Sequence, residues 1–247
     1  MLIASRNGFA VKFPITAKNY VQSGLVAMWD GIENIGWKKH DSNTTTWKNL
    51  AGDDTYDITL TNKAKFVADA MEVAATGGRI AYGSTALPRN DNLYHYEIVV
   101  SYDGVFSGNL MVFTGGGMFT ASGASRLCSP VVFYVSSQYK RKGFVFGSPA
   151  TLYRLDTDYT WTGKHQASGT HDFMSYDGQP LSEVIFSDTF ISMESNNTIM
   201  FSFANSNRTY DMPIGFRIHA LRIYSSRLSE SDRLSNYAVD KTRFNLP

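Results

Sequence analysis

The chain of 247 residues has a single cysteine, Cys128, which excludes an internal disulfide bond and any zinc site built from cysteines. Such a lone cysteine is most often a small buried apolar residue. The formal net charge is only +1, so the sequence has no electrostatic footprint for nucleic acid, and we expect no nucleic-acid partner. No apolar run is long enough to cross a bilayer, and we expect no membrane insertion.

Motifs that mark familiar enzymes are also missing. Glu230 is the one glutamate followed by an aspartate two residues later, Asp232, and no second glutamate follows it, so the E-x-D-x-E pattern of retaining glucanases does not occur. The five histidines lack the H-E-x-x-H spacing of a zinc site. There is no G-x-S-x-G nucleophile elbow, although the sequence leaves a Ser-His-Asp arrangement open. We therefore expect no enzyme activity and no metal or cofactor.

Short apolar or alternating runs, separated by Gly, Asn, Asp and Pro, predict many short strands and an all-β fold. The length fits one large β domain, because sandwiches of this size commonly fold as a single unit. The expected strands span residues 24–29, 56–61, 79–82, 94–102, 109–114, 131–136, 143–146, 151–155, 171–176, 182–186, 198–203 and 215–224.

The C-terminal segment, residues 215–244, carries the clearest pattern in the chain. Its alternating apolar residues predict a half-buried strand that runs into a helix. Ser229, followed three residues later by Asp232, resembles a capping box and marks the helix start. Apolar residues then recur at helical spacing, so we expect that face of the helix to pack against the body. They are Leu234, Tyr237 and Ala238.

The sequence divides into an N-terminal arm, residues 1–19, and one domain, residues 20–247. The arm is too apolar for a solvated tail, and Pro14 bars it from the middle of a sheet. We expect it to bury its apolar side chains against another chain or along a sheet edge. This predicts an oligomer or a larger assembly. The apolar residues are Leu2, Ile3, Phe9, Val11, Phe13 and Ile15.

Four segments, in order along the chain, resemble the laminin-G-like branch of the concanavalin A-like jelly rolls. They are GLVAMWDGIEN (residues 24–34), NLAGDDTYDITLT (49–61), HDFMSYDGQPLSEV (171–184) and RIYSSRLSESD with NYAVDK (222–241). The resemblance implies a jelly-roll sandwich of two antiparallel sheets with a short C-terminal helix. It also implies that loops at the edge or on the concave face contact a glycan or a protein partner.

The resemblance also bears on calcium. Asp53, Asp54 and Asp57 lie where members of the family often have a calcium-associated loop. Many relatives have an acidic pair in the last strand, just before a segment similar to VRIYNRAL, where this sequence has His219–Ala220. Because that carboxylate ligand is missing, we expect no metal, and interpret the aspartates as an Asx-rich turn.

A long polar loop, residues 30–49, offers the best candidates for sugar contact. An exposed indole can stack on the apolar face of a sugar, while a neighbouring Asp or His bonds its hydroxyls. The predicted ligand-binding residues are Trp37, His40, Asp41 and Trp47. The alternative is that a tryptophan in such a loop folds back and anchors it. Tyr139 and Trp161 are further loop-borne aromatics.

These observations predict a non-enzymatic, lectin-like binding or assembly module. The first 19 residues do not read as a signal peptide, because polar residues interrupt them. We therefore expect a virion or extracellular location reached by lysis, as for a bacteriophage fibre, decoration or adsorption protein. A bacterial surface adhesin or carbohydrate-binding module is one alternative. A glycan-active enzyme that uses Asp156 and Asp158 is the other, although these could simply line a solvated strand edge.

Overall fold

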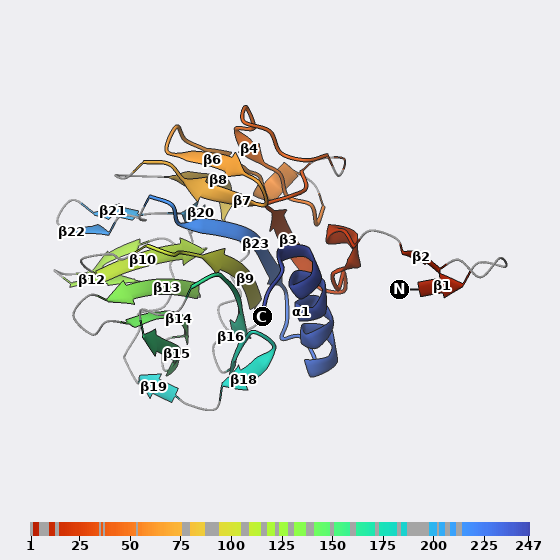
Figure 1. Ribbon diagram of the computed structural model, residues 1–247. Coiled ribbons are helices and arrows are strands. Elements are labelled where there is room, and N and C mark those ends of the chain that lie inside the picture. The colour runs from red at the N-terminus through yellow and green to blue at the C-terminus, as the bar shows by residue number, and fades with distance from the viewer. Residues whose placement is uncertain are drawn as a thin grey trace.

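The computed structural model describes residues 2–4, 10–12, 15–34, 36, 38–52, 54–75, 80–86, 94–104, 109–114, 118–121, 124–127, 131–136, 141–148, 151–158, 162–170, 173–181, 184–186, 198–201, 203–205, 208–210 and 214–247. These residues form antiparallel β-sheets and one α-helix near the C-terminus (Figure 1). The prediction of a mostly β protein with a C-terminal helix is therefore confirmed. The finer assignment, a jelly-roll sandwich of two sheets, is not shown by these sheets and stays a prediction.

The largest sheet has eight strands, of which seven follow the order β18-β17-β16-β9-β23-β7-β6, while β3 pairs with β23. All seven residues of β9 are buried, because the core covers one face of this strand and the C-terminal helix covers the other. The strands are β3 (Leu25–Asp30), β6 (Ala64–Val67), β7 (Ala70–Val73), β9 (His95–Ser101), β16 (Lys164–Thr170), β17 (Phe173–Tyr176), β18 (Gln179–Leu181) and β23 (Arg217–Tyr224).

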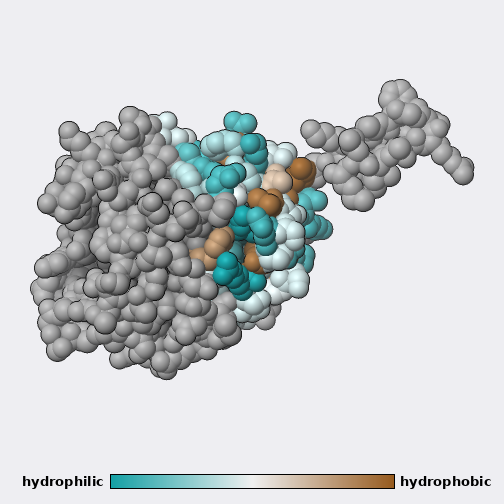
Figure 2. All heavy atoms as spheres, turned by 90° about the horizontal axis from the view of Figure 1, so that it is seen from below, coloured by the Kyte–Doolittle hydropathy of each residue, from teal (hydrophilic) through white to brown (hydrophobic). Residues whose placement is uncertain are grey.

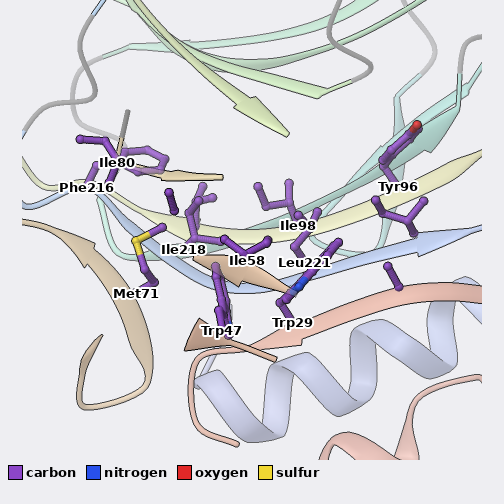
Figure 3. Close-up of a cluster of buried hydrophobic side chains, with 14 of the residues drawn as sticks. Trp29, Trp47, Ile58, Met71, Ile80, Tyr96, Ile98, Phe216, Ile218 and Leu221 are labelled. Atoms are coloured by element: carbon purple, nitrogen blue, oxygen red, sulfur yellow. The ribbon is translucent and has the colours of Figure 1, made fainter. Parts of the chain in front are cut away.

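A four-stranded sheet supplies the other side of the main hydrophobic core. Trp47 and Ile58 from this sheet pack with Trp29, Ile98 and Leu221 from the eight-stranded sheet (Figure 3). The core thus joins segments far apart in the sequence. The four strands are β4 (Thr46–Trp47), β5 (Ile58–Leu60), β8 (Ala81–Ala86) and β20 (Thr198–Phe201), in the order β20-β8-β5-β4.

The remaining described strands form a five-stranded sheet and three two-stranded pairs. The five are β10 (Asn109–Thr114), β13 (Val131–Ser136), β14 (Arg141–Ser148), β15 (Thr151–Asp158) and β19 (Val184–Phe186), in this order. The pairs are β1 (Leu2–Ala4) with β2 (Ala10–Lys12), β11 (Met118–Ala121) with β12 (Ala124–Leu127), and β21 (Phe203–Asn205) with β22 (Arg208–Tyr210). Strands β10 and β13 have the bounds that the sequence predicted.

The helix α1 (Glu230–Phe244) begins as predicted, since Ser229 Oγ accepts a hydrogen bond from the backbone N–H of Asp232 at 3.1 Å. The predicted inner face is wrong in part, since Tyr237 packs against a buried cluster but the other two residues do not. Leu234 is 41% exposed and Ala238 is exposed as well. The helix instead buries a mixed, largely polar face against the eight-stranded sheet. Its buried residues are Arg233, Asn236, Val239, Asp240 and Phe244.

The predicted arm divides into two parts. Strands β1 and β2 pair with each other and lie apart from the large sheets (Figure 1). Residues 15–19 instead lie on the body, where the 3₁₀ turn η1 (Ala17–Asn19) begins a buried cluster of Ala17, Tyr20, Met28 and Val239. Contact between the arm and the body thus starts before the predicted boundary at residue 19. A second 3₁₀ turn, η3, spans Asp54–Tyr56.

Candidate functional site

The loop that joins β3 to β4, residues 31–45, contains three of the four predicted ligand-binding residues. Trp37 lies outside the described residues. Trp47, the fourth residue, is in β4 and is fully buried in the main core (Figure 3). Its indole Nε1 donates to the backbone carbonyl oxygen of Asp30 at 2.9 Å. The Trp47 ring therefore anchors the loop, as the alternative interpretation held, and has no exposed face for a sugar.

His40 reaches the same acceptor as Trp47. Its Nε2 lies 2.8 Å from the carbonyl oxygen of Asp30 and, since a carbonyl only accepts, Nε2 carries the proton. The imidazole stacks on Phe66, with ring centroids 3.5 Å apart and planes 7° from parallel. Burial lowers the pKa of His40 although the bond to Asp30 opposes this shift, so the ring is neutral at pH 7. His40 thus holds the loop in place through its contacts with Asp30 and Phe66.

Asp41 is exposed and shapes the tip of the loop. Its Oδ1 accepts hydrogen bonds from the backbone N–H of Asn43 at 2.9 Å and from Thr44 Oγ1 at 3.1 Å. Thr44 Oγ1 in turn accepts the backbone N–H of Asp41 at 3.0 Å. This Asx-type turn presents the side chains of Asp41 and Asn43 to solvent.

Asp30 connects this loop to the C-terminal helix. While its carbonyl oxygen binds His40 and Trp47, its carboxylate accepts two hydrogen bonds from Arg243, at 2.6 and 2.9 Å. Asp30 Oδ1 also accepts the backbone N–H groups of Ile32 and Glu33, both at 2.9 Å. Asp30 is fully buried, so its charge is neutralised inside the protein and the start of the loop is held at several atoms.

Much of the described surface is polar. Figure 2 shows the face seen from below in Figure 1, away from β4 and its loop, and on that face the described residues are mainly hydrophilic while the hydrophobic ones are scattered. Among residues whose exposure is described, the exposed large hydrophobic side chains are Ile214 and Leu234. Such a surface favours a ligand that is recognised by hydrogen bonds over one that needs a broad apolar patch.

The contact between α1 and the eight-stranded sheet is a buried polar network that the sequence analysis missed. Arg222 in β23 donates Nε to Glu97 in β9 at 2.9 Å and pairs both terminal nitrogens with Asp240 in α1. Asn236 Nδ2 donates to Glu97 Oε2 at 2.8 Å, and Gln166 Nε2 donates to Asp240 Oδ2 at 2.8 Å. Burial raises the pKa of Glu97, while Arg222 opposes the shift. The network holds the helix in place and leaves no group exposed for a ligand.

A pattern in the sequence does mark this network. Glu97 lies among the apolar residues 96–100 of strand β9, and Asn236 and Asp240 are four residues apart on one face of the helix. Because polar residues at such positions need buried partners, the two features together indicate a helix on a polar sheet face.

The aspartates of the predicted turn are paired with a lysine. Lys48 Nζ lies 2.5 Å from Asp57 Oδ2 and 3.4 Å from Asp54 Oδ1, while Asp53 lies outside the described residues. In the part of the chain that the structure describes, no three side chains of His, Cys, Asp or Glu converge as a metal site would require. In that part, no helix has both the length and the apolar character needed to cross a membrane. Cys128, Tyr139 and Trp161 also lie outside it.

No protein family model matches the chain, and no curated protein sequence matches it. Its fold is similar to that of Trypanosoma rangeli sialidase in complex with sialic acid, with a TM-score of 0.60 and 14% identity over 98% of this chain and 36% of the sialidase. A mutant of that sialidase displaying trans-sialidase activity gives a TM-score of 0.58 and 14% identity, over 89% and 33% of the two chains. The botulinum neurotoxin serotype D binding domain gives 0.54 and 9%, over 88% and 52%.

This chain therefore spans about a third of the sialidase chains that it matches. At these identities the likeness shows the fold alone. It agrees with an all-β fold of the kind found in binding domains, while the laminin-G-like branch in particular has no support from a family model.

The prediction that this protein is not an enzyme is contradicted by these comparisons, because its fold recurs within the chains of a sialidase. That prediction rested on a missing pair of carboxylates. The carboxylate pair is the rule for most glycosidases, but sialidases use a tyrosine nucleophile instead. The missing E-x-D-x-E pattern therefore excludes one mechanism and not catalysis in general.

Proposed function

We propose that this chain is a lectin-like domain with a concanavalin A-like jelly-roll fold, which binds a glycan through the loop between β3 and β4. One observation carries the proposal. His40 Nε2 and Trp47 Nε1 both contact the carbonyl oxygen of Asp30, at 2.8 and 2.9 Å, while Asp41 and Asn43 in the same loop as His40 are exposed. A loop fixed in this way loses little conformational entropy when it binds a ligand.

The exposed groups suit sugar hydroxyls, since the carboxylate of Asp41 accepts hydrogen bonds and the amide of Asn43 both donates and accepts them. Trp37 is the ring that the sequence predicts for stacking on a sugar face. One such subsite gives a dissociation constant on the order of 1 mM. The likeness to a neurotoxin binding domain supports a binding role in general and leaves the ligand open between a glycan and a protein.

A glycan array probed with the purified protein tests this proposal. We expect Trp37→Ala and Asp41→Ala to lower the signal of the best-bound glycan at least fivefold, about 1 kcal/mol of binding free energy. Asp54→Ala is the matched control, because this carboxylate is also exposed but lies outside the loop. Binding that survives both loop substitutions would place the site elsewhere. If the protein binds no glycan on the array but binds a defined protein through the same residues, the ligand of this loop is a protein and not a glycan.

We propose that the hairpin β1–β2 joins this domain to another chain. Among the described strands, β1 and β2 pair only with each other, and an isolated two-stranded hairpin is marginally stable in water. Its free strand edges can add to another sheet. Deletion of residues 1–14, which keeps the buried Ala17 and Tyr20, should convert an oligomer into a monomer by light scattering. A full-length protein that is already monomeric would contradict this assembly role.

A second candidate function, a glycan-active enzyme, is favoured by the likeness to sialidases. Its predicted carboxylates, Asp156 and Asp158, lie two residues apart in β15. Turnover on a panel of glycans that includes sialosides would support it if Asp156→Asn or Asp158→Asn abolished the activity. Turnover that both variants retain would remove these two residues from the reaction.

The biological context of the protein, a virion or a bacterial surface, stays a prediction from the sequence. A bacteriophage fibre, decoration or adsorption protein is the first hypothesis, and a bacterial surface adhesin or carbohydrate-binding module is the second. The genes that flank this one distinguish them. Capsid and tail genes would favour the virion, and genes for cell-wall attachment would favour the adhesin.

A further inference from the structure

Ser101, His219 and Asp69 form a hydrogen-bonded chain on the face of the eight-stranded sheet that α1 covers. Ser101 is the last residue of β9, His219 lies in β23, and Asp69 lies in the turn between β6 and β7. Ser101 Oγ is 2.9 Å from His219 Nε2. His219 Nδ1 is 3.2 Å from Asp69 Oδ1 and 3.1 Å from the backbone carbonyl oxygen of Asp69.

These contacts determine which group donates and which accepts in each of the hydrogen bonds. Both neighbours of His219 Nδ1 are acceptors, a carboxylate and a carbonyl, so Nδ1 carries the ring proton. Nε2 of the neutral ring is then an acceptor, and the hydroxyl of Ser101 must donate to it. This is the arrangement in which a histidine can remove the proton of a serine as the serine attacks.

The backbone and a lysine both support this geometry. His219 sits at a β-bulge, because Ile218 pairs with Val100 of β9 while Ala220 pairs with Val99. A bulge re-aims the side chain of the extra residue, and bulges recur beside active sites. Lys164 Nζ forms an ion pair with Asp69 Oδ2. Burial alone would raise the pKa of Asp69, but the hydrogen bonds from His219 and Lys164 hold it well below its usual range, so the carboxylate is charged.

A second serine–histidine pair lies on the same face, but in this pair the histidine donates the hydrogen bond to the serine. Ser168 Oγ lies 2.7 Å from His95 Nε2, but the hydroxyl donates to Glu97 Oε1 at 3.2 Å. His95 Nε2 must then be the donor to Ser168, and no carboxylate holds its other nitrogen among the described residues. Ser168 therefore has no base to activate it, and it provides a matched control within the same protein.

The two serines also differ in their surroundings. Ser168 is fully buried, whereas Ser101 is 5% exposed. The residues paired with Ser101 on the neighbouring strands, Lys164 and Arg217, have side chains that are 30% and 44% exposed. Residues directly opposite one another share a face of the sheet, so Ser101 lies between two partly solvated side chains. A small acyl group would reach Ser101 from the side of Arg217, the more exposed of the two, while Lys164 stays paired with Asp69.

We propose that Ser101 is the nucleophile of an esterase site for small acyl esters, with His219 as its general base and Asp69 as a positioning residue. Ser101 Oγ attacks the ester carbonyl carbon and its proton moves to His219 Nε2. The bond from carbonyl carbon to alkoxy oxygen then breaks, and that proton leaves with the alcohol. Water then attacks the acyl carbon while His219 Nε2 takes its proton. The bond from that carbon to Ser101 Oγ breaks, the carboxylic acid leaves, and His219 returns the proton to Ser101 Oγ. This activity is independent of glycan binding by the β3–β4 loop.

A fluorophosphonate probe tests the nucleophile directly, because it phosphonylates base-activated serines with loss of fluoride. We expect the wild-type protein to be labelled, and peptide mass spectrometry to place the adduct on Ser101. Ser101→Ala should abolish labelling, while Ser168→Ala should leave it unchanged. No labelling of the native protein, or an adduct on another residue, would overturn the proposal even if a variant failed to fold.

Hydrolysis of p-nitrophenyl acetate tests the roles. We expect His219→Gln to lower kcat about 100-fold, the usual contribution of a general base. Asp69→Asn should lower kcat with little change in KM, because it disturbs the orientation of the imidazole and not the binding of the ester. Thermal melting checks that each variant is folded. Folded Ser101→Ala or His219→Gln protein that hydrolyses the ester at the wild-type rate would contradict the assignment.

Discussion

Arg222 and Asp240 meet as a fork between β23 and α1, with Nη1 to Oδ1 at 2.9 Å and Nη2 to Oδ2 at 2.5 Å. Neither side chain is exposed. The helix that closes the protein is therefore held by a buried ion pair where an apolar stripe was expected. A polar contact of this kind defines one position of the helix on the sheet, since any slide along β23 leaves a buried charge without its partner.

We predict that Asp240→Asn destabilises the protein by about 3 kcal/mol, because the substitution leaves the guanidinium of Arg222 buried with one carboxylate fewer. Urea unfolding followed by circular dichroism measures the loss. Ser235→Ala, at an exposed position of the same helix, is the control and should change stability by less than about 0.5 kcal/mol. Equal stability of the two variants would show that the fork does not hold the helix.

Gly31, at the start of the β3–β4 loop, lies against the turn that contains Asp69. A Cβ at Gly31 would lie 2.3 Å from the carbonyl oxygen of Asp69, a backbone atom that cannot move aside alone. Gly31→Ala should therefore cost about 3 kcal/mol of stability. At Gly52 a Cβ would meet no described atom within 4 Å, so Gly52→Ala is the matched control. Similar melting temperatures for the two variants would contradict this close approach.

His95 should make the protein sensitive to acid. Burial, with the charges of Arg227, Arg233 and Arg222, lowers the pKa of His95 from its usual 6.5 to about 3. Between these values the unfolded chain binds a proton that the folded protein does not bind. His95 therefore does not lower the free energy of unfolding above pH 6.5, and below that pH it lowers it by about 1.4 kcal/mol for each pH unit.

The comparison of unfolding free energies at pH 6.5 and pH 4.5 checks this sign. The wild-type protein should lose about 2 to 3 kcal/mol more than His95→Gln over this interval, because glutamine does not titrate. A wild-type profile parallel to that of the variant would mean that His95 does not titrate as its burial requires.

Much of the strand pattern could be predicted from the sequence, because apolar alternation and turn residues leave a strong local signal. Strands β10 and β13 and the start of α1 followed that signal. Strand β16 was missed because KHQASGT has almost no apolar residues. Its Ala167 faces the core, while Gln166 and Ser168 are buried beneath the helix, and only tertiary contact reveals this.

The hairpin of β6 and β7 was missed for a different reason. Its turn has no Gly, Asn or Pro. Ala68 itself adopts the left-handed conformation, with φ of 45°. A non-glycine residue rarely takes this conformation without tertiary support, so no local rule indicates a turn there. The turn positions Asp69 beside His219. Because the turn was not predicted, the hydrogen bonds among Ser101, His219 and Asp69 could not be predicted either.

The candidate site was predictable in part. The sequence pointed to the loop of residues 30–49 for sugar contact, but it could not distinguish a tryptophan that anchors a loop from one that faces a ligand. Burial makes that distinction for Trp47, which is fully enclosed by the core. The role of His40 as a second anchor depends on the carbonyl oxygen of Asp30, a backbone atom about which the side-chain pattern says nothing.

Glycan binding at the tip of the β3–β4 loop is tested most directly by a titration followed by ¹H–¹⁵N NMR. The titration uses the glycan that gives the strongest array signal. We predict that the amides of Asn43 and Thr44, which lie in the turn around Asp41, shift progressively, while that of Asp54 stays in place. Saturating shifts elsewhere, with the loop amides unmoved, would contradict the account.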